Sequence, residues 1–256
     1  MNENISRHHI SSNIRSFLMG RGYIEVVSPI LRNHNSKINP RFSVESQKYL
    51  RDCMELELRK KVSKVCPKVF EIGPCFRKDK EDDSHKAEFY MMELYSLGEG
   101  LEQMIDLMIG AVTACMSSVD DVKRISVREC IRTDLGIDIV STSTMSLIQS
   151  ITSKWPGIAA RGDYPYQTVN RYIETHIETT LTKKGCLYFL EEYPLCTITV
   201  ASRKGNSNCI QRFECFINGL EVSNAFEDCM DPNDLRVRLG ESGIMAGEEA
   251  ELLSLV

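Results

Sequence analysis

The sequence predicts an α+β fold in which helices flank an antiparallel β-sheet. Two stretches, 5–19 and 101–112, have the spacing of amphipathic helices. Two others indicate β-hairpins, one around a charged loop within 70–95 and one that turns at Asn218-Gly219, a strong short-range hairpin signal. Helices and hairpins in this order do not form the alternating pattern of a βαβ protein. Without an internal repeat or a linker, the 256 residues (1–256) are expected to form a single domain.

The remaining elements follow from local pattern. YIEVVSPIL, at 23–31, is β-rich and suits a strand that closes on a turn at Pro29. Tyr49 to Val65 has helical spacing, and Glu55 lies beside its apolar stripe. From about 120 to 185 the pattern alternates between short helical pieces and turns, and Leu187 to Tyr193 indicates a further strand.

Composition excludes several classes of protein. The formal net charge of −5 argues against a dedicated nucleic-acid binder, although it leaves tRNA binding open. No apolar run approaches the length of a membrane span, and the polar start MNENISRHH does not resemble a signal peptide. The 10 cysteines form no CxxC pair, so we expect reduced thiols in a cytoplasmic protein.

The strand FYMMELY carries a carboxylate among apolar neighbours. Phe89, Met91, Glu93 and Tyr95 share one face of this strand, and the other face is apolar as well, so we expect a central strand with Glu93 buried. A buried carboxylate needs a partner. That partner is either an arginine or lysine of the protein or the ammonium of a ligand, with the Tyr95 hydroxyl beside it.

The charged loop before this strand has polar side chains at both of its ends. Arg77 could clamp a phosphate through its planar guanidinium. Phe89 could stack on a base, and Glu88 could accept from an exocyclic amine. His85, Glu88 and Phe89 also have ordinary explanations, as a surface histidine, a hairpin glutamate and a core phenylalanine.

A second acidic cluster follows the Asn-Gly turn, with Glu221, Asn224, Glu227 and Asp228. Mg²⁺ bound to a triphosphate needs only one or two protein carboxylates. Glu221 and Asp228 could supply them if the strand ends or bulges between the two. The alternative is an acidic sheet edge that discourages edge pairing.

Six segments in the same order resemble the catalytic domain of class II aminoacyl-tRNA synthetases, in the lysyl branch. IRSFLMGRGYIEVVSPIL resembles motif 1, which dimerises these enzymes, YLRDCMELELRKKV the segment before motif 2, and FEIGPCFRKDKEDDSHKAEFYMMELY motif 2. KRISVRECIRTDLGIDI, LYFLEEYPL and RFECFINGLEVSNAFED follow as in that family. The resemblance implies a homodimer that uses ATP and Mg²⁺.

The resemblance also implies roles for the residues at the first acidic loop. Arg77 would be the catalytic residue, holding the α-phosphate of ATP and the amino-acid carboxylate. His85 would face the γ-phosphate, Glu88 would read the adenine amine, and Phe89 would stack on the adenine ring.

Further roles concern the amino acid and the metal. Glu55 would bind the α-amino group of the substrate, and Glu93 with Tyr95 the side-chain ammonium of lysine or a lysine-like diamino acid. Asn224 would lie near the amino acid. Glu221 and Asp228 would hold Mg²⁺ on the phosphates.

Three departures from the family pattern bear on function. Motif 1 begins almost at Met1, without a preceding anticodon-binding domain. Ser84 stands where the family has an arginine, and the chain stops at GEEAELLSLV, where motif 3 would begin. We therefore expect a C-terminally incomplete class II fold, similar in layout to free-standing paralogues such as the ligase that attaches β-lysine to elongation factor P.

Two functions remain open from the sequence. The first is ATP-dependent activation of a lysine-like amino acid and its transfer to a non-tRNA or undetermined acceptor. The second is a non-catalytic paralogue that senses an amino acid or nucleotide, or that dimerises with an active synthetase as its regulatory partner. A truncated or split form of a longer enzyme is compatible with either.

Overall fold

The computed structural model describes residues 3–35, 41–62, 66–78, 81–82, 85–116, 119–197 and 200–241. It confirms the α+β class and divides into two compact units, Met1–Glu99 and Gly100–Gly243. The expectation of a single domain stays a prediction. No helix in the described ranges combines the length and apolar character needed to cross a membrane.

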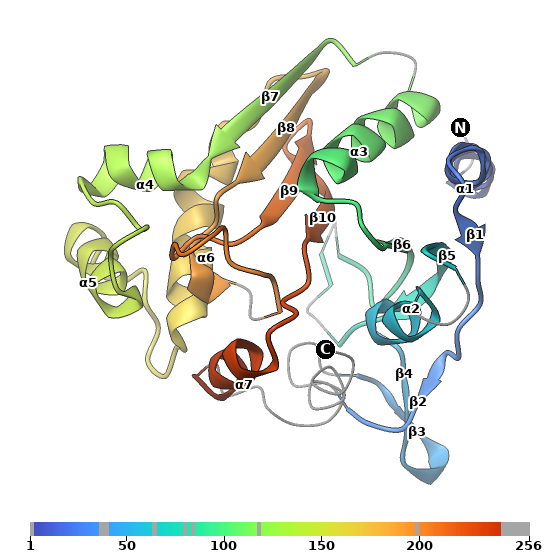
Figure 1. Cartoon of the computed structure of the whole chain (residues 1–256), viewed down its shortest axis with the longest axis horizontal. Coiled ribbons are helices and arrows are strands. Elements are labelled where there is room, and N and C mark those ends of the chain that lie inside the picture. Colours follow the sequence, from blue (N-terminus) through green and yellow to red (C-terminus); the bar gives the residue numbers. More distant parts are fainter. Residues whose placement is uncertain are drawn as a thin grey trace. The chain divides into compact units, whose positions relative to one another are not determined.

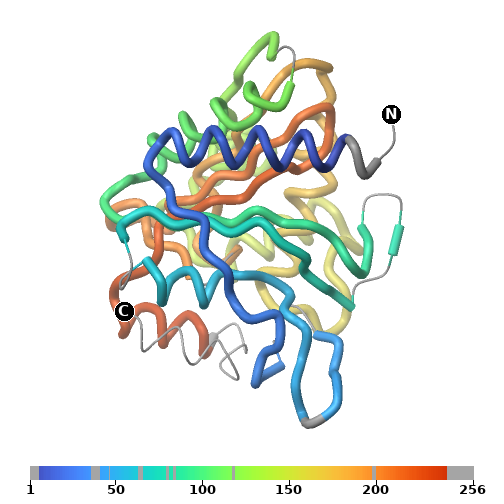
Figure 2. The backbone as a smooth tube through the Cα atoms, turned by 90° about the vertical axis from the view of Figure 1, so that its right-hand side faces the viewer, coloured from blue at the N-terminus to red at the C-terminus, as the bar shows by residue number. Residues whose placement is uncertain are grey.

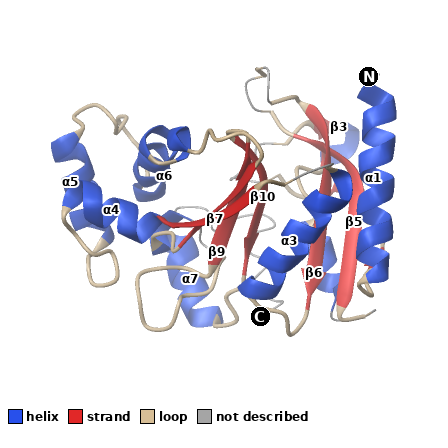
Figure 3. Ribbon diagram, turned by 90° about the horizontal axis from the view of Figure 1, so that it is seen from above, coloured by secondary structure: helices blue, strands red, loops and turns tan. Residues whose placement is uncertain are grey.

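The first unit is built around a long β-hairpin. Its elements, in chain order, are α1 (Glu3–Gly20), β1 (Ile24–Glu25), β2 (Leu31–Arg32), β3 (Ser43–Val44), η1 (Glu45–Gln47), β4 (Lys48–Leu50), α2 (Glu55–Val62), β5 (Lys68–Phe76) and β6 (Glu88–Ser96) (Figure 1). β5 and β6 pair antiparallel, and β1 adds to β5 in parallel. α1 runs alongside the hairpin (Figures 2 and 3).

One face of the hairpin carries the small core of the first unit. The side chains of Phe89, Met91 and Tyr95 pack against a cluster that includes Met54 and Leu58. Their alternation along β6 confirms that these residues share a face. The expectation of a central strand was wrong, because in the described sheet β6 lies at the edge and pairs only with β5, and its residues are partly buried or exposed. The helix α2 covers that face, which brings its first turn over the middle of β6.

Two predicted elements of this unit were wrong in extent. The helix expected from Tyr49 to Val65 covers only α2, because Lys48–Leu50 forms a strand between β2 and β3; Val65 lies outside the described residues. The strand expected over 23–31 contains only the two short strands β1 and β2. In both cases pairing with distant segments overrides the local pattern.

The second unit is a four-stranded mixed sheet in the order β10-β9-β8-β7, covered by helices. Its elements are α3 (Leu101–Cys115), β7 (Asp121–Ser126), α4 (Val127–Leu135), α5 (Thr144–Lys154), α6 (Pro165–His176), η2 (Glu178–Thr180), β8 (Cys186–Glu191), η3 (Leu195–Thr197), β9 (Arg212–Ile217), β10 (Leu220–Phe226) and α7 (Pro232–Glu241). β7, which the sequence did not predict, pairs with β8 in parallel, as a crossover through α4–α6 permits.

Alternation along β8 explains why both faces of this sheet are covered. Leu187 and Phe189 pack with Ile105 of α3 on one face. Tyr188 and Leu190 pack with residues of α4, α5 and α6 on the other. A strand that is buried on both faces carries apolar residues at successive positions, as β8 does from Cys186 to Leu190.

The predicted turn at Asn218-Gly219 is confirmed. Both residues have positive φ, 53° and 81°, as a two-residue hairpin turn requires. The return strand β10 bulges between Glu221 and Ser223 and ends at Phe226. The condition set for a metal pair at Glu221 and Asp228, a bulge or strand end between them, is therefore met.

All 10 cysteines are free thiols.

Candidate functional site

Glu93 occupies the middle of β6, under the first turn of α2. Its Oε2 accepts a hydrogen bond from the backbone N–H of Met54 at 2.8 Å. Burial, and next the negative charge of Glu55, raise the pKa of Glu93 to about 8. The residue is partly buried, and among the described residues it forms no ion pair. The expectation of an arginine or lysine partner is thus replaced by a backbone amide.

Two thiols lie close to this carboxylate and are affected by the same burial and negative charge. Burial raises the pKa of Cys75 to about 12, with the charge of Glu93 as the next cause. The pKa of Cys53 is also raised, by burial first and then by Glu93, Asp52 and Glu55. Such surroundings favour a positively charged ligand group.

Arg77 lies near the same region, beyond the end of β5. Its Nε donates to the backbone carbonyl of Asp52 at 3.3 Å, and its guanidinium carbon lies 5.2 Å from the centre of the Phe89 ring. Its positive charge lowers the pKa of Glu93, although less than burial and Glu55 raise it. The structure therefore places Arg77 beside the Phe89 ring and close enough to Glu93 to affect its titration.

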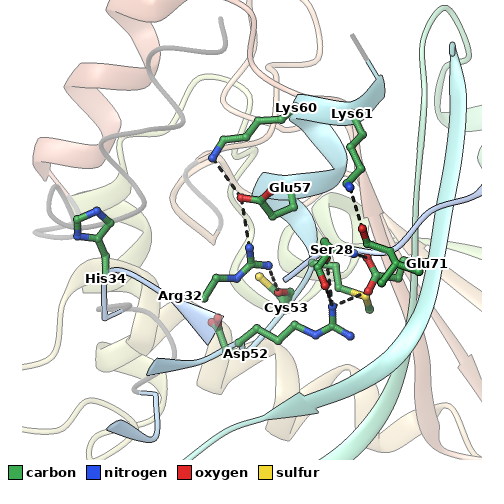
Figure 4. Close-up of polar contacts among 12 residues, drawn as sticks. Ser28, Arg32, His34, Asp52, Cys53, Glu57, Lys60, Lys61 and Glu71 are labelled. Carbon is green, nitrogen blue, oxygen red and sulfur yellow. Dashed lines mark hydrogen bonds and ion pairs between the residues drawn. The ribbon is translucent and has the colours of Figure 1, made fainter. Parts of the chain in front are cut away.

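A buried ion pair includes a residue of β5, the strand that pairs with β6. Arg51 and Glu71, 2% and 3% exposed, pair at 2.5 Å, and the second carboxylate oxygen of Glu71 accepts from the Ser28 backbone N–H at 2.9 Å. Glu71 lies directly opposite Glu93 on the paired strand. Gly73 gives the Arg51 guanidinium its space, since a Cβ there would clash with it. Figure 4 shows Ser28 next to Glu71.

The remaining residues of the predicted ATP site lie at the exposed loop end of the hairpin. Glu88 is exposed at the start of β6. The Nδ1 atom of His85 lies 3.0 Å from an oxygen of Asp82. Both side chains can meet a ligand from solvent. Ser84 lies outside the described residues.

A separate acidic pocket lies in the second unit, with about 90 Å³ of space. Its lining residues are Asn170, Ile173, Glu174, Glu178, Tyr193, Arg212, Glu214 and Glu221. Burial raises the pKa of Glu178 to about 8, followed by the charges of Glu214, Glu174 and Glu221. Glu214 forms an ion pair with Arg212 and accepts from the Tyr193 hydroxyl at 2.6 Å.

The predicted cluster at 221–228 is divided by the structure. Glu221 faces the acidic pocket, and the Asn224 side-chain oxygen accepts from Arg212 at its rim at 3.0 Å. Glu227 instead accepts from the Leu101 backbone N–H at the start of α3 at 3.1 Å. Asp228, whose backbone bridges to Ala201, is not among the residues that line the pocket.

Sequence reasoning missed the pocket residues Glu178 and Glu214. Glu214 carried the same signal as Glu93, a carboxylate within a strand that is apolar on both sides. Glu178 had no comparable signal. It belongs to the short turn η2, and only the fold brings it close to Glu214.

Comparison with known proteins now identifies the family. The chain belongs to the tRNA synthetases class II (D, K and N), which match residues 1–254. It is similar to the lysine–tRNA ligase of Enterococcus faecalis (26% identity over 260 residues, 93% of this chain and 52% of that protein). The corresponding values are 28%, 91% and 50% for the Methanoculleus marisnigri ligase, and 28%, 91% and 52% for that of Mycoplasma genitalium. The chain is thus lysyl-tRNA synthetase-like and spans about half the length of these relatives.

Proposed function

We propose that this protein activates lysine, or a lysine-like diamino acid, as an aminoacyl adenylate at the expense of ATP. The observation that carries the proposal is the Glu93 carboxylate, which is desolvated, lies beside Glu55 and forms no ion pair among the described residues. A substrate ammonium would supply the missing positive charge. Tyr95, on the same face of β6, would contact that ammonium as well, and Glu55 would receive the α-amino group.

Arg77 would carry the chemical step. The amino-acid carboxylate attacks the α-phosphorus of ATP, the bond to the leaving pyrophosphate breaks, and the aminoacyl adenylate remains. Charge on the phosphoryl oxygens is stabilised by a guanidinium that is already held in place. Among the described residues, the Arg77 guanidinium contacts a backbone carbonyl and an aromatic ring, so its charge stays available for a phosphate.

ATP would occupy the loop end of the hairpin. Phe89 would stack on the adenine and Glu88 would accept from its amine, while His85 would meet the γ-phosphate. Phe89 is partly buried and Glu88 is exposed. This arrangement suits an adenine ring that stacks on Phe89 with its amine edge toward solvent. Stacking on an aromatic side chain contributes about 1–3 kcal/mol per base.

Glu221 and Asp228 would hold Mg²⁺. Mg²⁺ that is bound to a triphosphate needs only one or two protein carboxylates, with phosphate oxygens and water as its other ligands. When bound, the ion neutralises phosphate charge.

Homodimerisation through the motif 1 segment is part of the proposal. Several apolar side chains within 10–31 are exposed, among them Val27 at 82% and Met19 at 62%. A dimer contact would cover such side chains. The 10 free thiols support a reducing, cytoplasmic setting.

The test is ATP–pyrophosphate exchange across α-lysine, β-lysine, ornithine and uncharged amino acids. Exchange with a diamino acid alone supports the proposal and names the substrate. Exchange with uncharged amino acids, or none at all while lysine binds in calorimetry, contradicts it, and the second result favours a sensor. Transfer to tRNA, the acceptor in the relatives' names, is tested next, with a protein acceptor as the alternative.

A further inference from the structure

The segment that links β4 to α2 is held by three arginines. Arg77 donates to the backbone carbonyl of Asp52, and Arg32 donates to that of Cys53 at 3.2 Å. Arg41 binds the Asp52 side chain, with distances of 2.6 Å from Nε and 2.5 Å from the second nitrogen to the same oxygen. Figure 4 shows Arg32 directed at Cys53 and Glu57, with Asp52 close by.

The same segment makes one contact that points into the site. The backbone N–H of Met54 donates to Glu93. The backbone of Asp52–Met54 therefore contacts the side chains of both Arg77 and Glu93. A shift of this segment would move both groups.

Arg41 is built into the protein on its other side. It is 3% exposed, its remaining guanidinium nitrogen, Nη1, donates to the backbone carbonyl of His34 at 2.8 Å, and its backbone N–H donates to the side-chain oxygen of Asn35 at 3.0 Å. Asp52 is 2% exposed. A buried, charge-assisted pair with these anchors holds the segment more firmly than a surface pair would.

We infer that the Arg41–Asp52 ion pair is a positioning device, which sets the Arg77 guanidinium and the Glu93 carboxylate through the backbone of Asp52–Met54. The functional part of this inference rests on the proposed function. Neither Arg41 nor Asp52 needs to touch a substrate. The positioning itself has a readout that requires no substrate at all.

That readout is the titration of Glu93. The charged and titratable groups that face its carboxylate are Glu55, Arg77 and Asp52, together with the thiols of Cys53 and Cys75. The Met54 hydrogen bond and the Arg77 charge lower the pKa of Glu93 and outweigh the opposing charge of Asp52. A loosened segment would weaken both, so the pKa of Glu93 would rise.

The experiment is carboxyl carbon NMR on ligand-free protein that carries labelled glutamate, with the Glu93 signal assigned by Glu93→Gln. Arg41→Met is expected to raise the pKa of Glu93. Arg41→Lys, which keeps the charge but cannot make all the contacts, is expected to raise it less and serves if the first variant does not fold. Arg15→Met, which removes an exposed ion pair with Glu25, is the matched control and should leave the pKa unchanged. An unchanged or lowered pKa in both Arg41 variants overturns the inference.

Kinetics then test the functional part. Arg41→Met should raise the KM for lysine and lower kcat of exchange, each on the order of tenfold, because misplacement of reacting groups by less than 1 Å has such effects. Arg41→Lys should recover part of both. If wild-type protein shows no exchange but the pKa still shifts, the proposed function fails and the positioning stands. A pKa shift with unaltered exchange kinetics overturns the functional part.

Discussion

The backbone N–H of Met54 donates to Oε2 of Glu93, which places a carboxylate of β6 at the first turn of α2. The partial positive charge of a helix N-terminus favours an anion there. Burial and the negative charge of Glu55 disfavour the ionised carboxylate more strongly than the Met54 N–H favours it, so the pKa of Glu93 is raised. We therefore expect Glu93 to ionise when a positively charged ligand group binds beside it.

Glu93→Gln should weaken lysine selectively. Loss of one charge-assisted contact costs about 1.5–3 kcal/mol, so the KM for lysine should rise roughly 10- to 100-fold in pyrophosphate exchange, with the KM for ATP unchanged. Glu99→Gln removes a carboxylate of the same unit that pairs with Lys68, and it is the matched control. An equal loss for lysine and ATP would contradict the pocket assignment.

Arg77→Ala should abolish most exchange without unfolding the protein. Removal of one group that stabilises transition-state charge lowers kcat about 10²–10³-fold. Since Arg77 is partly exposed and contacts a backbone carbonyl and the Phe89 ring, we expect thermal melting close to that of wild type. Exchange within a few-fold of the wild-type rate would refute its catalytic role.

The unfolding free energy of the ligand-free protein should depend on pH through the titration of Glu93. Its pKa is about 8 in the folded protein and 4.5 in the reference state, so its contribution is fully present below 4.5 and is lost as pH rises through 8. Between those limits, wild type should lose up to about 1.4 kcal/mol of unfolding free energy per pH unit relative to Glu93→Gln. Urea denaturation of both proteins at pH 5, 6.5 and 8 measures this; a constant difference would show that Glu93 is not desolvated.

The metal assignment predicts which carboxylates set the Mg²⁺ requirement. Glu221→Gln and Asp228→Asn should each raise the Mg²⁺ concentration for half-maximal exchange by about tenfold, as loss of one ligand does for a cation held by one or two carboxylates. Glu227→Gln is the control, because Glu227 accepts from the start of α3. If Glu214→Gln has the effect and Asp228→Asn does not, the acidic pocket supplies the second ligand.

The sequence predicted the parts of the fold that local signals determine. The hairpin at 70–95, the turn at Asn218-Gly219 and the helix α3 depend on period and turn chemistry. Strands β4 and β7 could not be predicted, since Lys48–Leu50 and Asp121–Ser126 become strands only by pairing with distant segments. β-Propensity depends strongly on such tertiary context.

In the candidate site, too, only residues with a local sequence signal could be predicted. Glu93 was found because a carboxylate in an apolar strand needs a partner, whereas its actual partner, the Met54 amide just before α2, depends on tertiary packing. The Arg41–Asp52 pair had no local signal, because its partners are 11 residues apart in a stretch without regular spacing.

The central claim, that Glu93 receives a substrate ammonium, has a direct test in calorimetry of lysine binding at pH 7. Glu93 is mostly protonated at this pH in the free protein, while the side-chain amine of lysine, with a pKa of about 10.4, is already charged. Binding should therefore release close to one proton, seen as a difference in heat between two buffers of unlike ionisation enthalpy, and Glu93→Gln should abolish the release. Lysine binding without proton release, or with the same release in Glu93→Gln, would contradict the claim.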